Sequence, residues 1–112
     1  MFVLKTNPTV VWPVDIGMPA NGGKLQIIPV NITYKLIPQE EYDRLKVSDF
    51  DLLRVVVVGW GDEDFGAQSA DGETQDVMPY SPENLNRLIA FPFVRSGLIT
   101  GFWEAQAGIE KN

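Results

Sequence analysis

Leu52-Leu53-Arg54-Val55-Val56-Val57-Val58-Gly59-Trp60-Gly61-Asp62 is the apolar stretch around which the rest of the chain is organised. Its four consecutive valines favour a strand, because β-branched side chains pack well on a pleated surface. The spacing of Leu53, Val56, Val57 and Trp60 instead follows one face of a helix. Ser48 or Asp49 would cap such a helix, and the glycine at 59 or 61 would end it. We favour the helix, and the choice between helix and strand at residues 52–58 stays open.

The residues before this stretch have the pattern of β-strands. Apolar and polar residues alternate with the two-residue period of a strand over positions 30–36, where the apolar residues are Val30, Ile32, Tyr34 and Leu36. Asn21-Gly22 predicts the turn of a hairpin. Pro13 predicts an edge strand, since proline donates no backbone hydrogen bond, and Pro29 indicates an edge or a bulge. Residues 1–37 therefore form the β-rich part of the expected fold.

The residues after position 37 have the signals of short helices. Pro38, followed by acidic residues, suits the start of one helix, and Ser81-Pro82 places an N-cap and a first-turn proline at the start of another. Phe91-Pro92 predicts a further helix that Gly108 closes. We expect an α+β fold in a single domain over 1–112. In it, a hairpin or meander precedes a helical part (38–107) of three to four short helices, interrupted by an acidic loop at 61–80.

The chain lacks the residues of most catalytic and metal sites. It contains no histidine and no cysteine, which excludes Ser-His-Asp and Cys-His catalysis and the usual zinc ligands. The acidic loop at 61–80 interleaves carboxylates with glycines, but it does not follow the ligand order of an EF-hand. No phosphate-binding glycine motif occurs. We therefore expect no enzyme activity, no metal and no cofactor.

The charge balance bears on the class of partner. The net charge is −6, and the nine basic residues are scattered, so no nucleic-acid surface is expected. No run of 18 apolar residues occurs, so no membrane span is expected either. A protein partner, such as a basic one, fits better. Four aromatic residues near the end of the chain either fill the core or form an exposed patch that binds the partner. These residues are Phe91, Phe93, Phe102 and Trp103.

The order of motifs resembles a known family. Trp12 with Val14 and Ile16, the strand Val30-x-Ile32-x-Tyr34, the Gly59-Trp60-Gly61 segment, Tyr80-Ser81-Pro82-Glu83-Asn84 and Pro92-x-Val94-Arg95 occur in the order typical of the tail assembly chaperones of siphovirus-type phages and prophages. The resemblance covers most of the chain. It implies a protein without enzyme activity or cofactor that works in the cytoplasm of the bacterial host.

The resemblance also implies partners. Such chaperones bind the tape measure protein, keep it soluble and help to recruit the tail tube protein, in some genomes through a longer form made by ribosomal frameshifting. The chain resembles the short form, and its ending, Glu110-Lys111-Asn112, is compatible with a slippery codon run. Self-association of the chain is a further candidate interaction. The alternative function is a small structural component of the phage tail or head–tail connector that is incorporated in the virion.

Overall fold

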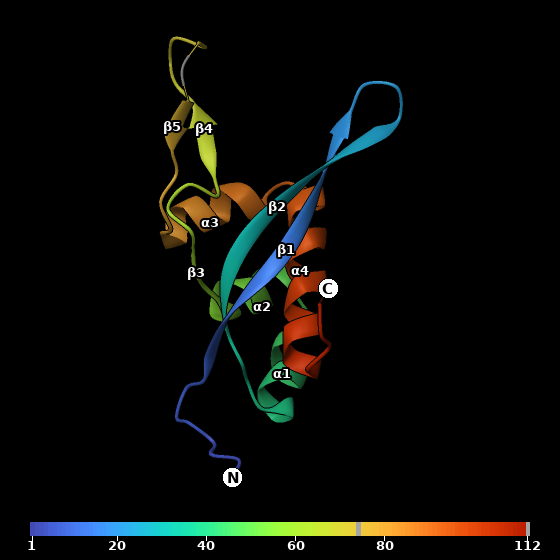
Figure 1. The fold of residues 1–112 in the computed structure, drawn as a ribbon, viewed down its shortest axis with the longest axis vertical. Coiled ribbons are helices and arrows are strands. Elements are labelled where there is room, and N and C mark those ends of the chain that lie inside the picture. Colours follow the sequence, from blue (N-terminus) through green and yellow to red (C-terminus); the bar gives the residue numbers. More distant parts are fainter. Residues whose placement is uncertain (74, 112) are drawn as a thin grey trace.

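The computed structural model describes residues 1–73 and 75–111 and has an α+β fold (Figure 1). Strands β1 (Thr9–Ala20) and β2 (Lys24–Lys35) form a long antiparallel hairpin, with Gly22 and Gly23 at positive φ in its turn. Strand β3 (Val57–Trp60) extends the sheet to the order β1-β2-β3. The predicted Asn21-Gly22 turn and the N-terminal hairpin are confirmed. Thr74, in the predicted loop, and Asn112 lie outside the described residues.

The helical part follows the hairpin, as predicted. Within the described residues its helices are α1 (Gln39–Leu45), α2 (Asp49–Val56), α3 (Pro82–Ile89) and α4 (Pro92–Ala107). The serine caps form as expected: Ser48 Oγ accepts from the Asp51 N–H at 3.3 Å, and Ser81 Oγ accepts from the Asn84 N–H at 3.0 Å. Gly108 ends α4 in the left-handed conformation, at φ 74°.

The central apolar stretch is divided between a helix and a strand. Helix α2 ends at Val56, and the chain becomes extended at Val57, so the helix prediction is correct only for the first half and the predicted end at Gly59 or Gly61 is wrong. The change occurs because β2 offers a free edge there, with Val57 opposite Tyr34. All four residues of the predicted helical face are nevertheless buried, since Val57 and Trp60 reach the same core from β3.

The two strand prolines lie where the sheet tolerates them. Pro13 is in β1, which is an edge strand as predicted. Pro29 lies in β2, the central strand, but β3 pairs with β2 only over Ile32–Tyr34. At Pro29, β2 has β1 on one side and no strand on the other. The missing N–H of Pro29 therefore breaks no hydrogen bond to a second neighbouring strand.

The acidic segment 61–80 is not a structureless loop, contrary to expectation. Strands β4 (Gly66–Gln68) and β5 (Gln75–Val77) pair in it as a small antiparallel hairpin. These strands are three residues long and mostly exposed, so they carry no alternating apolar signal that the sequence could reveal. The preceding turn is fixed by Asp64, whose Oδ2 accepts from the backbone N–H groups of Asn31 and Gly61, both at 2.9 Å.

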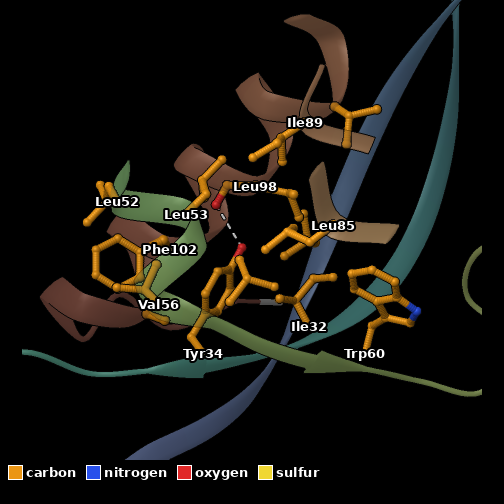
Figure 2. Close-up of a cluster of buried hydrophobic side chains, with 14 of the residues drawn as sticks. Ile32, Tyr34, Leu52, Leu53, Val56, Trp60, Leu85, Ile89, Leu98 and Phe102 are labelled. Atoms are coloured by element: carbon orange, nitrogen blue, oxygen red, sulfur yellow. Dashed lines mark hydrogen bonds between the residues drawn. The ribbon is translucent and has the colours of Figure 1, made fainter. Parts of the chain in front are cut away.

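Helix α4 packs across β1 and β2 and closes the core (Figure 2). Two glycines allow the close approach: a Cβ on Gly101 would lie 2.5 Å from Val14 Cγ2, and one on Gly97 would lie 3.0 Å from the Asp15 carbonyl oxygen. The fully buried Tyr34 donates its hydroxyl to the Leu98 carbonyl oxygen at 2.7 Å, which joins the sheet to α4. Its ring also meets Phe102 edge-on, at 5.6 Å between centroids.

We expect Tyr34→Phe to lower the free energy of unfolding at neutral pH by about 1 kcal/mol, the usual net value of one hydrogen bond. Burial, together with the negative charge of Glu104, raises the pKa of Tyr34 above its ordinary value of about 10. The neutral phenol is therefore the folded form. Its contribution is complete below pH 10 and is lost as the pH rises further. Urea unfolding between pH 7 and 11 should show a shallower alkaline loss in Tyr34→Phe than in the wild type, and equal slopes would contradict this account.

Candidate functional site

The exposed stripe of α4 is unusual for a helix surface because it carries no charge. Its members face solvent at intervals of three or four residues along the helix: Pro92, Ser96, Thr100, Trp103 and Ala107. A solvent-facing helix normally places charged and polar residues on this side. Helix α3, by contrast, exposes Glu83 and Arg87. We refer to the five residues as the α4 stripe. Figure 1 shows α4 on the outside of the fold.

The four aromatic residues predicted to bind a partner do not form one patch. Trp103 is 53% exposed and lies on the α4 stripe, and Phe91 is 57% exposed just before it. Phe93 is half-buried, with its ring centroid 5.9 Å from that of Phe91. Phe102 is only 1% exposed, and its ring lies against those of Tyr34 and Tyr42, so it belongs to the core.

The division between Phe102 and Trp103 follows from helix geometry. Successive residues of a helix point about 100° apart, so one of two neighbours can face the core while the other faces away. Of the two interpretations of these aromatic residues, the core therefore holds for Phe102 and the exposed position for Trp103. The residues of α4 that are buried are Val94, Leu98, Gly101, Phe102 and Ala105.

An aromatic–guanidinium cluster lies beside the α4 stripe and escaped the sequence analysis. Phe50 of α2 is 37% exposed, and its ring centroid lies 4.5 Å from the guanidinium carbon of Arg95 of α4 and 5.6 Å from that of Arg54 of α2. Arg95 also donates to the Ile89 carbonyl oxygen at the end of α3. The i, i+4 spacing of Phe50 and Arg54 is the one signal that could have indicated this pair. Arg54 also pairs with Asp51 at 3.6 Å, so Arg95 is the cation that this cluster adds to α4.

A groove borders α4 on the side of the hairpin. Its volume is about 400 Å³. Leu25 and Phe93 are apolar residues of its lining, which also includes Ser96 and Thr100 of the α4 stripe. Asp15 presents its backbone carbonyl oxygen to Gly97 of α4. Glu104 is paired with Lys111 at 3.1 Å. We call this feature the hairpin–α4 groove.

Residues 1–5 form a second apolar feature, which we call the N-terminal arm (Figure 1). The side chains of Met1, Phe2, Val3 and Leu4 are each at least 66% exposed. The arm leaves β1 at Asn7, whose φ of 52° lies in the left-handed region that few residues other than glycine adopt. The sequence pattern predicted only that this segment belongs to the β-rich part, and the exposed arm was not expected.

The acidic segment packs around Trp60. Trp60 Nε1 donates to the Met78 carbonyl oxygen at 2.9 Å, and the rings of Phe65 and Tyr80 meet the indole edge-on. Partial burial raises the pKa of Tyr80, whose hydroxyl donates to the Val57 carbonyl oxygen. Among residues 1–73 and 75–111, no group of three or more His, Cys, Asp or Glu side chains is placed to hold a metal ion.

Comparison of the chain with protein families, with curated proteins and with solved structures gives no match. In the part of the chain that the structure describes, every helix is too short or too polar to span a bilayer. Besides the α4 stripe and the hairpin–α4 groove, the described residues form a pocket of about 730 Å³ that the N-terminal arm lines together with Leu36, Ile37 and Pro38.

Proposed function

We propose that the chain is a non-catalytic phage or prophage tail assembly chaperone. It acts in the cytoplasm of the bacterial host, binds the tape measure protein, keeps that protein soluble and helps to recruit the tail tube protein. The observation that supports this proposal most is the uncharged α4 stripe with the exposed Trp103, on a chain whose net charge is −6. It agrees with the family resemblance of the sequence, which implies a partner with a long, helical and apolar surface.

The α4 stripe has the chemistry of a surface that packs against another helix. Ser96, Thr100 and Ala107 are small, so they let a second helix approach to the usual interaxial distance of about 8–10 Å. Trp103 supplies the large apolar anchor that dominates many interfaces. From Pro92 to Ala107 the stripe runs for about 22 Å at the rise of an α-helix. It therefore matches about four turns of a partner helix that presents an apolar seam.

A chaperone needs charge for solubility as well as an apolar surface for binding, and the rest of the surface supplies the charge. Net charge keeps a protein soluble and resists its self-precipitation. The carboxylates of segment 61–73 are exposed or half-buried away from the α4 stripe, on the turn before β4 and on the β4–β5 hairpin (Figure 1). The α4 stripe would therefore cover the apolar surface of a bound chain, while the carboxylates of segment 61–73 stay in contact with water and keep the complex soluble.

Trp103→Glu tests the role of the stripe directly. We expect it to weaken binding to the tape measure protein of the same genome by about 30-fold or more, since removal of an interface tryptophan typically costs at least about 2 kcal/mol. Val77→Glu is the matched control, because Val77 is 59% exposed and lies on β5, away from α4. Co-elution from an affinity column measures both. Equal retention of the tape measure protein by the two variants would refute the proposed surface.

The alternative function is that of a structural subunit of the tail or head–tail connector. The exposed N-terminal arm favours it, because an apolar segment of this kind needs a neighbouring surface in a stable assembly. Quantitative mass spectrometry of purified virions separates the two functions. We expect the chain to be absent from finished particles, and a fixed stoichiometric amount in them would support the structural subunit instead.

A further inference from the structure

The end of the β1–β2 hairpin, residues 17–27, projects beyond the rest of the sheet (Figure 1). Strand β3 pairs with β2 only over residues 32–34, so the end of the hairpin is a ribbon of two strands. Such a ribbon is marginally stable in water, because each of its strands keeps an unpaired edge. Leu25 and Ile27 of this part are 64% and 56% exposed. A further strand would therefore cover both open backbone groups and apolar side chains.

The strand register shows which backbone groups of β2 point away from β1. The Asn31 N–H donates to Asp64 Oδ2 at 2.9 Å, and the Asn31 carbonyl oxygen accepts from the Gly61 N–H at 3.3 Å, so both groups lie on the side opposite β1. In an antiparallel pair this direction alternates along the strand, and the β1–β2 register is continuous over its whole length. The N–H and C=O groups of Leu25 and Ile27 therefore also point away from β1. In the described part of the chain, no strand pairs with them there.

The free edge of β1 is protected against strand pairing. Pro13 and Pro19 pair with Asn31 and Leu25, so their ring nitrogens face outward and remove two donors from that edge. Helix α4 covers the same edge, where a Cβ on Gly97 would lie 3.0 Å from the Asp15 carbonyl oxygen. Prolines and covering helices are the usual means by which proteins prevent edge-to-edge association. Neither protects the β2 edge at Leu25 and Ile27.

The low charge of the hairpin favours a second copy of this chain as the added strand. Lys24 is the one charged residue between positions 16 and 31, in a chain of net charge −6. Two copies therefore meet here with less repulsion than at the acidic segment. With a two-fold axis at Gln26, Lys24 lies opposite Ile28 of the second copy rather than opposite the second Lys24. Like charges directly opposite each other, which would destabilise the pairing, are thus avoided.

We propose that the β2 strands of two copies pair antiparallel about a two-fold axis at Gln26, so that the hairpins join in one sheet of order β1-β2-β2-β1. Leu25 lies opposite Ile27 of the second copy, and the two residues exchange both backbone hydrogen bonds. Their side chains share one face of the sheet, so the contact also covers apolar surface of both copies. The arrangement closes as a dimer. Because the contact is shorter than a standard interface of about 1,600 Å², the dimer is weak and depends on concentration. This inference concerns identical chains and stands independently of the proposed function.

Disulfide trapping tests the two-fold axis, because the chain contains no cysteine of its own. Gln26 would face its copy as a non-hydrogen-bonded pair with about 4.5 Å between Cα atoms, which is within the range of a disulfide. Gln26→Cys should therefore be captured as a disulfide-linked dimer in a glutathione redox buffer. Val11→Cys is the matched control, since Val11 is 63% exposed on β1 but lies outside the contact, and it should stay monomeric. Equal yields of linked dimer from the two variants would overturn the proposal.

Ile27→Pro tests the backbone pairing without a crosslink. It removes an N–H that points away from β1, as the natural Pro29 does two residues later, so the fold should be unchanged by circular dichroism. Sedimentation equilibrium should show dimerisation weakened by about tenfold or more, since each copy loses one hydrogen bond. Ile27→Val keeps the N–H and should dimerise as the wild type does. A wild type that is monomeric at every concentration, equal dimerisation of the two variants, or species larger than a dimer would contradict the proposed contact.

Discussion

Trp60→Ala is expected to lower the free energy of unfolding by about 3–5 kcal/mol, the usual cost of truncating a buried aromatic side chain. The indole joins β3 to the acidic segment through its hydrogen bond to the Met78 carbonyl oxygen and through edge contacts with Phe65 and Tyr80, at 4.8 and 5.0 Å between centroids. A domain of this size is stable by about 5–15 kcal/mol in total. The variant should therefore lie close to the limit of folding at 37 °C.

Urea unfolding followed by circular dichroism measures this effect, and Trp60→Phe serves as the graded comparison. Phenylalanine keeps much of the apolar ring but loses the N–H donor, so we expect a smaller loss, about 1–3 kcal/mol. If the free energy of unfolding of Trp60→Ala stayed within about 1 kcal/mol of the wild-type value, the Trp60 side chain would not be holding the acidic segment to the sheet.

Gly101→Ala is expected to destabilise the fold by about 1–3 kcal/mol, although alanine in a helix interior normally gains about 1 kcal/mol over glycine. The new methyl group would lie 2.5 Å from Val14 Cγ2 and 2.8 Å from the Tyr34 hydroxyl oxygen. Val14 is a β-branched residue held in the sheet, and the Tyr34 hydroxyl is fixed by its bond to Leu98. Helix α4 would have to move away from β1.

Thr100→Ala is the matched control for this steric argument. Thr100 precedes Gly101 on α4 but is exposed, so the substitution should leave stability unchanged or raise it slightly. Thermal unfolding of both variants measures the difference. Opposite signs for the two changes are the expected result, and a stabilised Gly101→Ala would show that α4 has room to accept a side chain there.

Local signals in the sequence were sufficient for much of the fold. Ser48, Ser81-Pro82 and Gly108 act through groups within a few residues of themselves, so their capping roles could be predicted without knowledge of the tertiary structure. The alternating pattern that ends at Tyr34 and the Asn21-Gly22 turn likewise predicted the hairpin. In each case the residue that carries the signal and the backbone groups that it interacts with lie close together along the chain.

Features that depend on distant partners were not predictable in this way. The stretch 52–60 changes from helix to strand at Val57 because β2 offers an edge there, and no residue within the stretch encodes that edge. Gly101 would be an unfavourable residue for an isolated helix, and its role becomes clear only when Val14 is seen opposite it.

The candidate site shows the same limit. Aromatic content drew attention to Phe91, Phe93, Phe102 and Trp103, but composition could not separate the buried Phe102 from the exposed Trp103 beside it. The α4 stripe is defined instead by the absence of charge at its exposed positions, which include Ser96 and Thr100. That pattern is present in the sequence, but it can be recognised only once the buried face of α4 is known.

Co-expression of this chain with the tape measure protein of the same genome tests the proposed chaperone function most directly. The quantity measured is the soluble fraction of the tape measure protein with and without this chain, followed by size-exclusion chromatography of the soluble material. The proposal predicts that the tape measure protein becomes soluble and co-elutes with this chain. If it stays insoluble while this chain alone forms defined rings, the chaperone function is contradicted and the structural-subunit function replaces it.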